Sequence, residues 1–544
     1  KVLSTAINSN SNLSKHLQKL HASTKLEANP VSVDTLEVSQ APPAKQQRLD
    51  FNRTVSQGQI NKAIARYVVE NMQPVSTVES PAFRQFVSMI TCSGGTQQMG
   101  RKTFSNYLDK EYSKVESELK TTFEGLDYIA TTADIWSVHN NSFLGMTAHW
   151  INTATPKRQK AALACKRIKG RHTYDVIAAE IDHIHSLYGL STKATATVTD
   201  NGSNFVDDDD EEDEEVTFTN VADVLDTSTE EGIVLPPHLR CASHTLNFIS
   251  CSDVDKWLLS NPGTKGIYRT ATAKCTALWS KASRSTLASE LVGDLVGKKL
   301  LVPFSTRWNS FYDAVARIVE IPMTDLSTIS NRLELKCIGE REFQFLREYC
   351  AIMKPLTVAL DVLQGEENCY YGTLLPTIEV LMSKLLEIKE GLIIATGAIK
   401  TRFASVLESN DAILAAVTLP MFKLRWLRDQ RKKEMVKGML SAECHKLIPR
   451  PGPVQQAAKM PVSPTVETEV MTYLRTAVTG MEILKQFPTI KDISLKKNAA
   501  TPSSAPVERL FSLRSLVLSP KRNKLSDQRF ERLLLMRYNH WFEG

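Results

Sequence analysis

The chain has 544 residues, of which 42% are apolar and 23% charged, so it can bury a large core of two to four domains and is not disordered throughout. No apolar run is long enough to cross a bilayer, the first residues lack a signal-peptide pattern, and nine cysteines without a repeated spacing indicate reduced thiols, so we expect an intracellular protein without a membrane span. The formal net charge of +6 includes an unbroken run of nine acids at 207–215, so the rest of the chain is more basic and suits a polyanionic partner.

The first 53 residues carry a histidine pair and a polar linker. Residues 10–21 are typical of a short helix, in which four residues separate His16 from His21, and this spacing fits half of a tetrahedral zinc site. No cysteine precedes Cys92, so these two histidines cannot complete a zinc site by themselves. The composition of residues 22–53 is polar and without an apolar period, which predicts a flexible linker.

After the linker, the pattern changes from helical to β-type. Apolar residues at helical spacing predict a small helical domain over 54–120. Short β-type runs and one helical segment follow, in the order 128–135, 143–151, 161–168, 173–187 (helix) and 195–199. Strand, strand, strand, helix, strand is the RNase H-like order, so we expect the first part of such a domain over 121–254. The acidic run 207–215 should lie in a loop, as a solvated spacer rather than a decoy for DNA, because adjacent like charges repel one another.

The second half of the chain is mainly helical. Apolar stripes at helical spacing, as in 343–363 and 374–392, predict an all-α insertion over 255–480. Residues 481–544 would then complete the RNase H-like domain and end in an amphipathic helix near 525–542, which packs either on that domain's own sheet or on a partner. The predicted fold class is therefore α/β, with an RNase H-like domain interrupted by a large helical insertion and preceded by a small helical domain.

Three carboxylates stand where a metal site could form. Asp134 ends an apolar strand, Asp200 follows a short strand, and Glu508 lies in the first turn of a helix whose start is marked by Ser504 and Pro506. Divalent cations prefer hard oxygen ligands, and two-metal phosphoryl transfer needs carboxylates brought together from separate segments. Taken singly, each aspartate is more often a turn residue, and the glutamate a partner of the helix dipole.

Four short motifs, together with these carboxylates, carry a family resemblance. They are DIWS at 134–137, CASHTLN at 241–247, TRWNS at 306–310 and ERLFS at 508–512. In this order they resemble the hAT superfamily of DNA transposases and look closest to its Tol-type fish members, and the helix with His16 and His21 is similar to the tail of a BED zinc finger. The resemblance implies that Asp134, Asp200 and Glu508 form a catalytic DDE triad that holds Mg²⁺ or Mn²⁺. It also implies that residues 1–21 are the C-terminal remnant of such a finger. The two histidines would then bind Zn²⁺ only in a longer form that contains the complete finger.

The resemblance further implies DNA contacts. Trp136 and Trp308, with Arg307 beside the latter, would help to hold a distorted or flipped base, and His244 would contact the scissile phosphate or flanking DNA. The alternatives are buried core tryptophans and a packed histidine at a helix start. The helical domain over 54–120 would bind transposon ends and dimerise, and the C-terminal region would also contribute to a dimer.

We therefore predict a nuclear cut-and-paste transposase. It would bind terminal inverted repeats, cleave DNA by metal-dependent phosphoryl transfer, leave hairpins on flanking DNA and join 3′ ends to target DNA, as at least a dimer and without a membrane partner. The main alternative is a domesticated derivative that binds DNA or chromatin without transposition. A stand-alone RNase H-like nuclease is disfavoured by the helical insertion and by the zinc-finger remnant.

Overall fold

The structure, a computed structural model, describes most of the chain after the predicted linker. The described residues are 55–90, 92, 95–138, 141–170, 173–200, 235–303, 309–388, 393–447, 465–514 and 525–541. Several predicted features lie outside them: His16 and His21 with the finger remnant at 1–21, the linker at 22–53, the acidic run at 207–215, Arg307 and Trp308.

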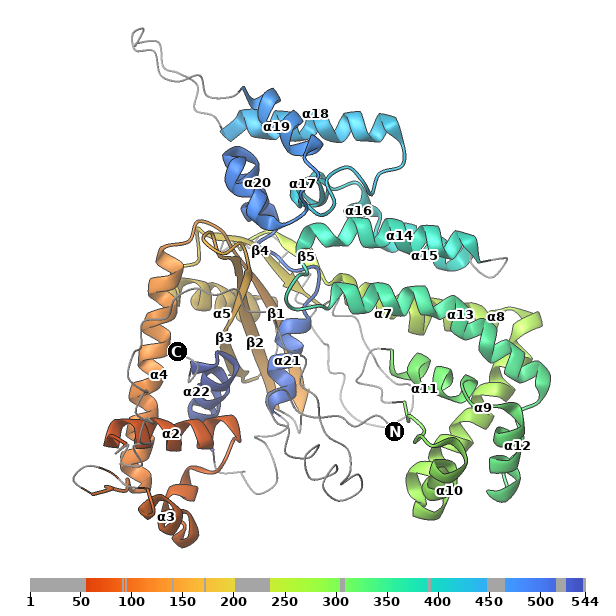
Figure 1. Cartoon of the computed structure of the whole chain (residues 1–544), viewed down its shortest axis with the longest axis horizontal. Helices are drawn as coiled ribbons and strands as arrows, with labels where there is room; N and C mark the ends of the chain where they lie inside the picture. Colours follow the sequence, from red (N-terminus) through yellow and green to blue (C-terminus); the bar gives the residue numbers. More distant parts are fainter. Residues whose placement is uncertain are drawn as a thin grey trace, which may run out of the picture. The chain divides into compact units, whose positions relative to one another are not determined.

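The described residues form one five-stranded mixed sheet in the order β3-β2-β1-β4-β5 (Figure 1). Its strands are β1 (Ile129–Val138), β2 (Asn141–Ile151), β3 (Arg158–Ile168), β4 (Ala194–Thr199) and β5 (His238–Arg240). β2 is antiparallel to β1 and β3, whereas β4 is parallel to both β1 and β5. Helix α5 (Tyr174–Leu187) connects β3 to β4. The first four strands and this helix confirm the sequence-based prediction, but β5 was not predicted, because three residues are too few to show a period.

Helices cover both faces of the sheet. On one face, Phe123 at the end of α4 (Arg101–Glu124) and the apolar side of α5 share a buried cluster with Leu144 and Met146 of β2. On the other face, α21 (Ala505–Arg514) and α22 (Asp527–Tyr538) share a cluster with Phe143 of β2 and Cys165 of β3. A central strand covered on both faces needs a near-continuous apolar run, and β2 is accordingly buried from Ser142 onward.

The edge strand β3 is covered by α22 and the residue that follows it. The Ala162 N–H donates to Asn539 Oδ1 at 2.7 Å, and Asn539 Nδ2 donates to the Ala162 carbonyl at 3.1 Å. The Cys165 N–H donates to Glu531 Oε1 at 3.0 Å. These side chains occupy the edge where a further strand would otherwise pair. The apolar face of α22 is thus buried within the chain, which confirms the alternative that the C-terminal amphipathic helix packs on its own sheet.

Among the described residues, three α-helices precede the sheet, α2 (Gln57–Glu70), α3 (Pro81–Ser88) and α4, with the short 3-10 helix η1 (Val75–Glu79) between the first two. Ser56 and Gln59 form a capping box at the start of α2, and Ser80 caps α3 directly before a proline, so each helix begins where its sequence supplies a partner for free backbone N–H groups. Buried residues of α2 and α4 join the cluster around α22. The helices expected over 54–120 are therefore present and pack beside the sheet.

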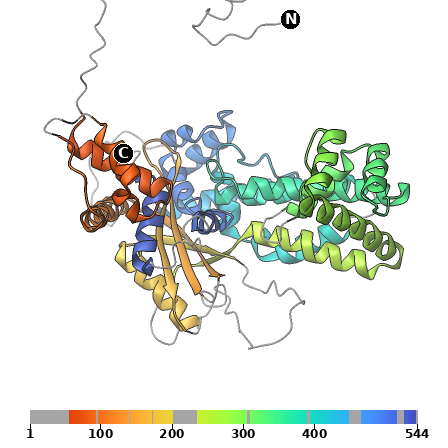
Figure 2. The same ribbon diagram turned by 90° about the horizontal axis from the view of Figure 1, so that it is seen from below.

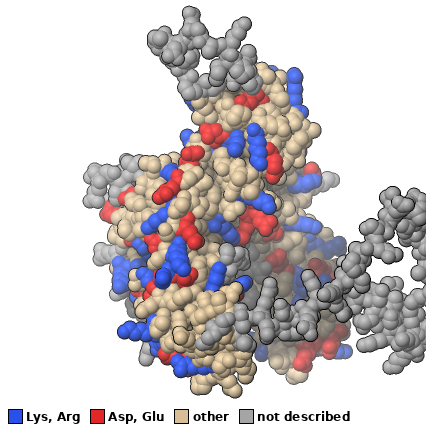
Figure 3. All heavy atoms as spheres, turned by 60° about the vertical axis from the view of Figure 1, so that its left-hand side comes forward, with Lys and Arg blue, Asp and Glu red and all other residues tan. Residues whose placement is uncertain are grey.

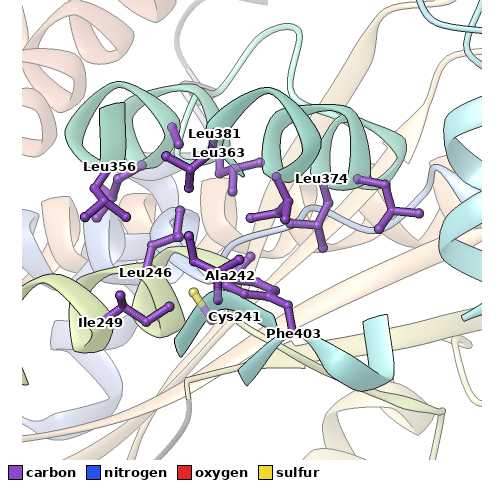
Figure 4. Close-up of a cluster of buried hydrophobic side chains, with 14 of the residues drawn as sticks. Cys241, Ala242, Leu246, Ile249, Leu356, Leu363, Leu374, Leu381 and Phe403 are labelled. Atoms are coloured by element: carbon purple, nitrogen blue, oxygen red, sulfur yellow. The ribbon is translucent and has the colours of Figure 1, made fainter. Parts of the chain in front are cut away.

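The described residues from 254 to 475 contain helices and no strand of the sheet. The longer ones are α9 (Pro262–Arg284), α10 (Thr286–Val296), α11 (Ser310–Val319), α12 (Met323–Arg332), α13 (Glu340–Leu363), α14 (Leu374–Glu387), α15 (Ile393–Arg402), α18 (Gln430–Leu447) and α19 (Val466–Arg475). In Figure 2 the green helices lie beside the strands rather than over them. Leucines of α13 and α14 meet α7 (Ala242–Phe248) in one buried cluster (Figure 4), which couples this part to the sheet. The described parts of 255–480 are thus mainly helical, as the sequence predicts, and the boundaries of an insertion stay a prediction.

Two surface properties bear on the expected partners. Among the described helices, none is both long and apolar enough to cross a membrane. On the face shown in Figure 3, Lys and Arg side chains lie among Asp and Glu side chains rather than forming one continuous basic field. The basic excess of the sequence is therefore not gathered on this face.

Candidate active site

The structure brings the three predicted carboxylates to one place. Asp134 lies in β1, Asp200 directly follows β4, and Glu508 lies in the first turn of α21. Asp200 and Glu508 both act electrostatically on Asp134, and Asp200 also acts on Glu508. Residues far apart in sequence thus converge at one end of the β1/β4 pair.

Strand register accounts for the two aspartates. β1 and β4 are parallel, and Ala133 is the partner of Thr199. The next residues along the two chains are Asp134 and Asp200. Neighbouring strands lie about 5 Å apart, so the two aspartates lie side by side at the same end of the β1/β4 pair. Parallel pairing therefore places Asp200 beside Asp134 without any loop having to fold back.

A glycine on β2 accounts for the close approach of the glutamate helix. Gly145 is the strand partner of Asp134, and α21 packs across both strands. A Cβ at position 145 would lie 2.6 Å from the Phe511 ring and 2.8 Å from Val507 Cγ2. A side chain here would force Phe511 and Val507 to move, so Gly145 permits the close packing of α21, the helix that carries Glu508. No local pattern in the sequence points to this role of Gly145.

A hydrogen-bonded clasp around Cys241 fixes the segment that leads into α21. The Cys241 N–H donates to the Thr199 carbonyl at 2.8 Å, and the Ala242 N–H donates to the Pro502 carbonyl at 2.8 Å. The buried Cys241 Sγ accepts from the Ser504 N–H at 3.3 Å and donates to Ser503 Oγ at 3.6 Å. The CASHTLN motif thus joins the end of β4, beside Asp200, to the start of the glutamate helix.

Cys241 and His244 are in contact through the start of helix α7. Cys241 is the N-cap of α7, and its Sγ accepts from the His244 N–H at 3.4 Å. Burial raises the pKa of the Cys241 thiol, and Glu508 raises it further, which disfavours a thiolate metal ligand here. His244 lies close enough to Glu508 to lower the pKa of that carboxyl. His244 is therefore part of the site's surroundings.

The electrostatics of the site favour an added cation. Burial, then Asp200 and Glu508, hold the pKa of Asp134 well above its usual range, although the Ile135 N–H donates to Asp134 Oδ1 at 2.8 Å. Burial, with Asp200, also raises the pKa of Glu508 to about 7, against opposing effects of His244, Ser504 and Arg509. A bound divalent ion reduces the repulsion between like charges that lie close together in a buried place.

The donor types of the site bear on the predicted metal ions. Within the described ranges, no group of three His, Cys, Asp or Glu side chains is arranged so that it could hold a metal ion by itself. A two-metal phosphoryl-transfer site does not require such an enclosure, because each ion shares one or two carboxylates and completes its shell with phosphate and water oxygens. Asp134, Asp200 and Glu508 supply the oxygen donors that Mg²⁺ or Mn²⁺ prefers, and the binding of either ion by these residues stays a prediction.

The predicted DNA-contacting tryptophan of β1 has a protein partner. The Trp136 ring stacks on Phe511, with centroids 5.6 Å apart and planes 22° from parallel, and it packs against the cluster around α22. This contact favours the packing alternative and helps to seat the glutamate helix on the sheet. A DNA contact of Trp136 stays a prediction, as does that of the undescribed pair Arg307 and Trp308.

A group of ion pairs that no sequence pattern predicts links this site to the helical part. Arg509, next to Glu508, pairs with Glu366 at 3.0 Å and donates to the Gln364 carbonyl in the segment between α13 and α14. Lys160 of β3 pairs with the same glutamate. Against the effect of burial, these two cations hold the pKa of Glu366 below its usual value. These ion pairs hold the α13–α14 connection against both β3 and α21.

Comparisons with known proteins give distant relatives. No family model matches the chain. The chain is 20% identical to the human zinc finger BED domain-containing protein 4, over 97% of this chain and 48% of that protein. It is 25% identical to two maize proteins, the putative AC transposase and the putative AC9 transposase, over 45% of this chain and 29% and 28% of theirs.

These similarities support a relationship to hAT-like transposases in general terms. The chain spans about half or less of the length of these curated relatives. The closer resemblance to Tol-type fish members and the BED-finger remnant stay predictions.

Proposed function

We propose that this protein is a metal-dependent DNA transposase of the DDE type, which excises a DNA element and joins it to target DNA. The observation that carries the proposal is the convergence of Asp134, Asp200 and Glu508 from three distant segments, which raises the pKa of the Asp134 and Glu508 carboxyls. The similarity to two proteins named as transposases supports the same reaction class.

The strand order supports an RNase H-like catalytic domain. Three antiparallel strands, a crossover helix and then parallel strands are the arrangement expected for that fold, and the proposed triad uses β1, the end of β4 and a late helix. On this proposal the domain comprises 121–254 and 481–544, and the helices over 255–480 are an insertion. Residues 54–120 would bind transposon ends and contribute to a homo-oligomer, at least a dimer.

In the reaction, Asp134, Asp200 and Glu508 would hold Mg²⁺ or Mn²⁺. When bound, these ions offset charge on the scissile phosphate and lower the pKa of the attacking water or 3′-hydroxyl. The chain's own residues position and tune the carboxylates. Gly145 and the Cys241 clasp set the position of the glutamate helix, and His244 favours the ionised form of Glu508.

The remaining parts of the proposal concern partners. Terminal inverted repeats and target DNA would be the substrates, flanking DNA would be left as hairpins, and the nucleus would be the site of action. His244, Trp136, Arg307 and Trp308 would lie along the DNA path. A longer form that completes the BED finger would bind Zn²⁺ through His16 and His21.

A second candidate function follows from one comparison. The relative that matches 97% of this chain is named for its BED zinc finger and not as a transposase. A domesticated DNA-binding or chromatin protein with the same fold would give that similarity. Cleavage activity distinguishes the two candidates, because only the first needs three ionisable carboxylates at the sheet end.

The test is strand cleavage of cognate transposon ends in Mg²⁺ or Mn²⁺. Asp134→Asn, Asp200→Asn and Glu508→Gln should each abolish cleavage and leave binding to the ends largely intact, since each removes a proposed metal ligand and no proposed DNA contact. Asp175→Asn, at an exposed residue of α5, is the matched control. Near-normal cleavage by any of the three variants would remove that residue from the triad. Absence of cleavage by the unaltered chain, with specific binding retained, would favour the second candidate.

A further inference from the structure

A large apolar groove lies away from the carboxylates, on the α13–α14 hairpin. It has a volume of about 1040 Å³ and is lined by α13, α14, the segment between them and residues 421–426. Four of its large apolar side chains are markedly exposed: Val358 (52%), Val362 (44%), Val380 (59%) and Met421 (42%). Exposed apolar side chains gathered in one groove mark an interaction surface, whereas single ones need no explanation.

The two helices present matching faces to the groove. α14 runs back along α13 after a short connection, as Figure 1 shows. The lining residues of α13 are Ala351, Lys354, Pro355, Val358, Ala359, Asp361 and Val362, and those of α14 are Pro376, Thr377, Val380, Leu381 and Lys384. Both sets follow the three- and four-residue spacing of one helix face. The α13 face is about 16 Å long at 1.5 Å per residue, which equals three turns of a third helix.

Charge along the groove is asymmetric. Lys354 and Lys384 are nearly equally far from the hairpin connection, so they flank the same end of the groove, and Arg425 adds a cation to the lining. Lys384 also pairs with Glu387 at 2.9 Å, but both side chains are exposed and Glu387 does not line the groove, so this pair is screened by solvent. Acids gather toward the connection, where Asp361 and Glu367 line the groove. Glu366 is also there, but it is paired with Lys160 and Arg509. The groove thus has a basic end away from the hairpin connection and an acidic end beside it.

A proline inside α13 removes one helical hydrogen bond beside the groove. Pro355 lies inside α13 and has no N–H, so the carbonyl of Ala351 lacks the helical donor that position 355 would supply. Both residues line the groove near its basic end.

We propose that this groove binds an amphipathic helix of another protein, with acidic residues in the first turn of that helix seated between Lys354 and Lys384. A helix in this orientation places its acids beside the cations, where they also complement its own dipole, and its basic last turn beside Asp361 and Glu367. The apolar floor disfavours nucleic acid, whose phosphates would need a polar, basic lining throughout. The inference goes beyond the proposed DNA cleavage and does not depend on it.

The test measures binding of a labelled peptide to the full chain by fluorescence anisotropy. The probe is an acetylated helix of about 14 residues, with Glu in its first turn, Leu at i, i+3, i+4 and i+7, and Lys in its last turn. A second peptide has the same composition with Glu and Lys exchanged. We expect the first peptide to bind at least tenfold more tightly than the exchanged one, and Val358→Glu or Val380→Glu to weaken its binding at least tenfold.

Controls separate the alternative occupants. Met435→Glu changes an equally exposed apolar residue of α18 outside the groove and should leave binding unchanged. Lys354→Glu with Lys384→Glu should reverse the preference between the two peptides. Equal binding of both peptides, no binding of either, or binding that Val358→Glu leaves intact would overturn the proposal. Displacement of the peptide by random duplex DNA, or a self-association of the chain that Val358→Glu abolishes, would instead assign the groove to nucleic acid or to a second copy.

Discussion

Replacing Glu508 by Gln should stabilise the metal-free protein, although the proposed reaction needs this carboxylate. The reason is that Glu508 lies in a place that disfavours its ionised form. Burial, with Asp200, raises the pKa of Glu508 from 4.5 to about 7. A neutral Gln of similar shape keeps an oxygen for the Ser504 hydroxyl, which lies 3.4 Å from Glu508 Oε1, and carries no charge to desolvate.

The magnitude follows from proton linkage. Between pH 4.5 and 7 the folded protein binds more protons at Glu508 than the unfolded chain, so its free energy of unfolding falls as pH rises through this window. One pKa unit corresponds to about 1.4 kcal/mol, so the full cost of ionising Glu508 in the folded state is about 3 kcal/mol above pH 7. The variant should therefore gain little at pH 4.5, about 1 kcal/mol at pH 5 and about 3 kcal/mol at pH 8.

The assay is thermal unfolding of both proteins in a chelator from pH 5 to pH 8. Glu387→Gln removes an exposed acid of α14, whose ion pair with Lys384 is screened by solvent, and serves as the control for a general loss of charge. Adding Mg²⁺ at pH 8 should narrow the gap, because the ion stabilises only the protein that retains its carboxylate ligand. A stability difference that does not change with pH, or a variant less stable than the parent at pH 8, would refute the reasoning.

Three other predictions concern the elements around the site. Gly145→Ala should destabilise the chain by about 1–3 kcal/mol and reduce cleavage by displacing α21. Gly397→Ala, which has open space around its Cβ, should do neither. Equal effects of the two changes in thermal unfolding would contradict the packing argument. Glu366→Gln should lower the free energy of unfolding by no more than about 1 kcal/mol, because its ion pair with Arg509 is partly exposed and screened. In a double-mutant cycle, Glu366→Gln combined with Arg509→Met should lower it by less than the sum of the single changes. Deleting 207–215 should leave the melting temperature unchanged, and a large drop would show that the acidic run is structural and not a solvated spacer.

Local sequence patterns determined much of this protein. The period of apolar residues gave β1 to β4, α5 and the helical stretch after residue 254, because a strand or helix must place its apolar side chains at fixed spacing to bury them. The stripe of α14, from Leu374 to Leu385, is buried as that spacing requires. Turn residues after Asp200 and start signals before Glu508 are readable along the chain, whereas Asp134 lies inside β1 rather than at its end and was singled out only by the family resemblance of the DIWS motif.

Contacts between distant segments decided the rest. Gly145 has no local signature of its role, which is set by Val507 and Phe511 approaching from the other end of the chain. Trp136 could equally have faced DNA or protein, and only the arrival of α21 decides that it stacks on Phe511. The C-terminal helix α22 was amphipathic in either alternative, and only the position of the edge strand β3 shows what its apolar face covers. A periodic pattern specifies that a face is buried, but the partner that buries it is fixed by the packing of the whole chain.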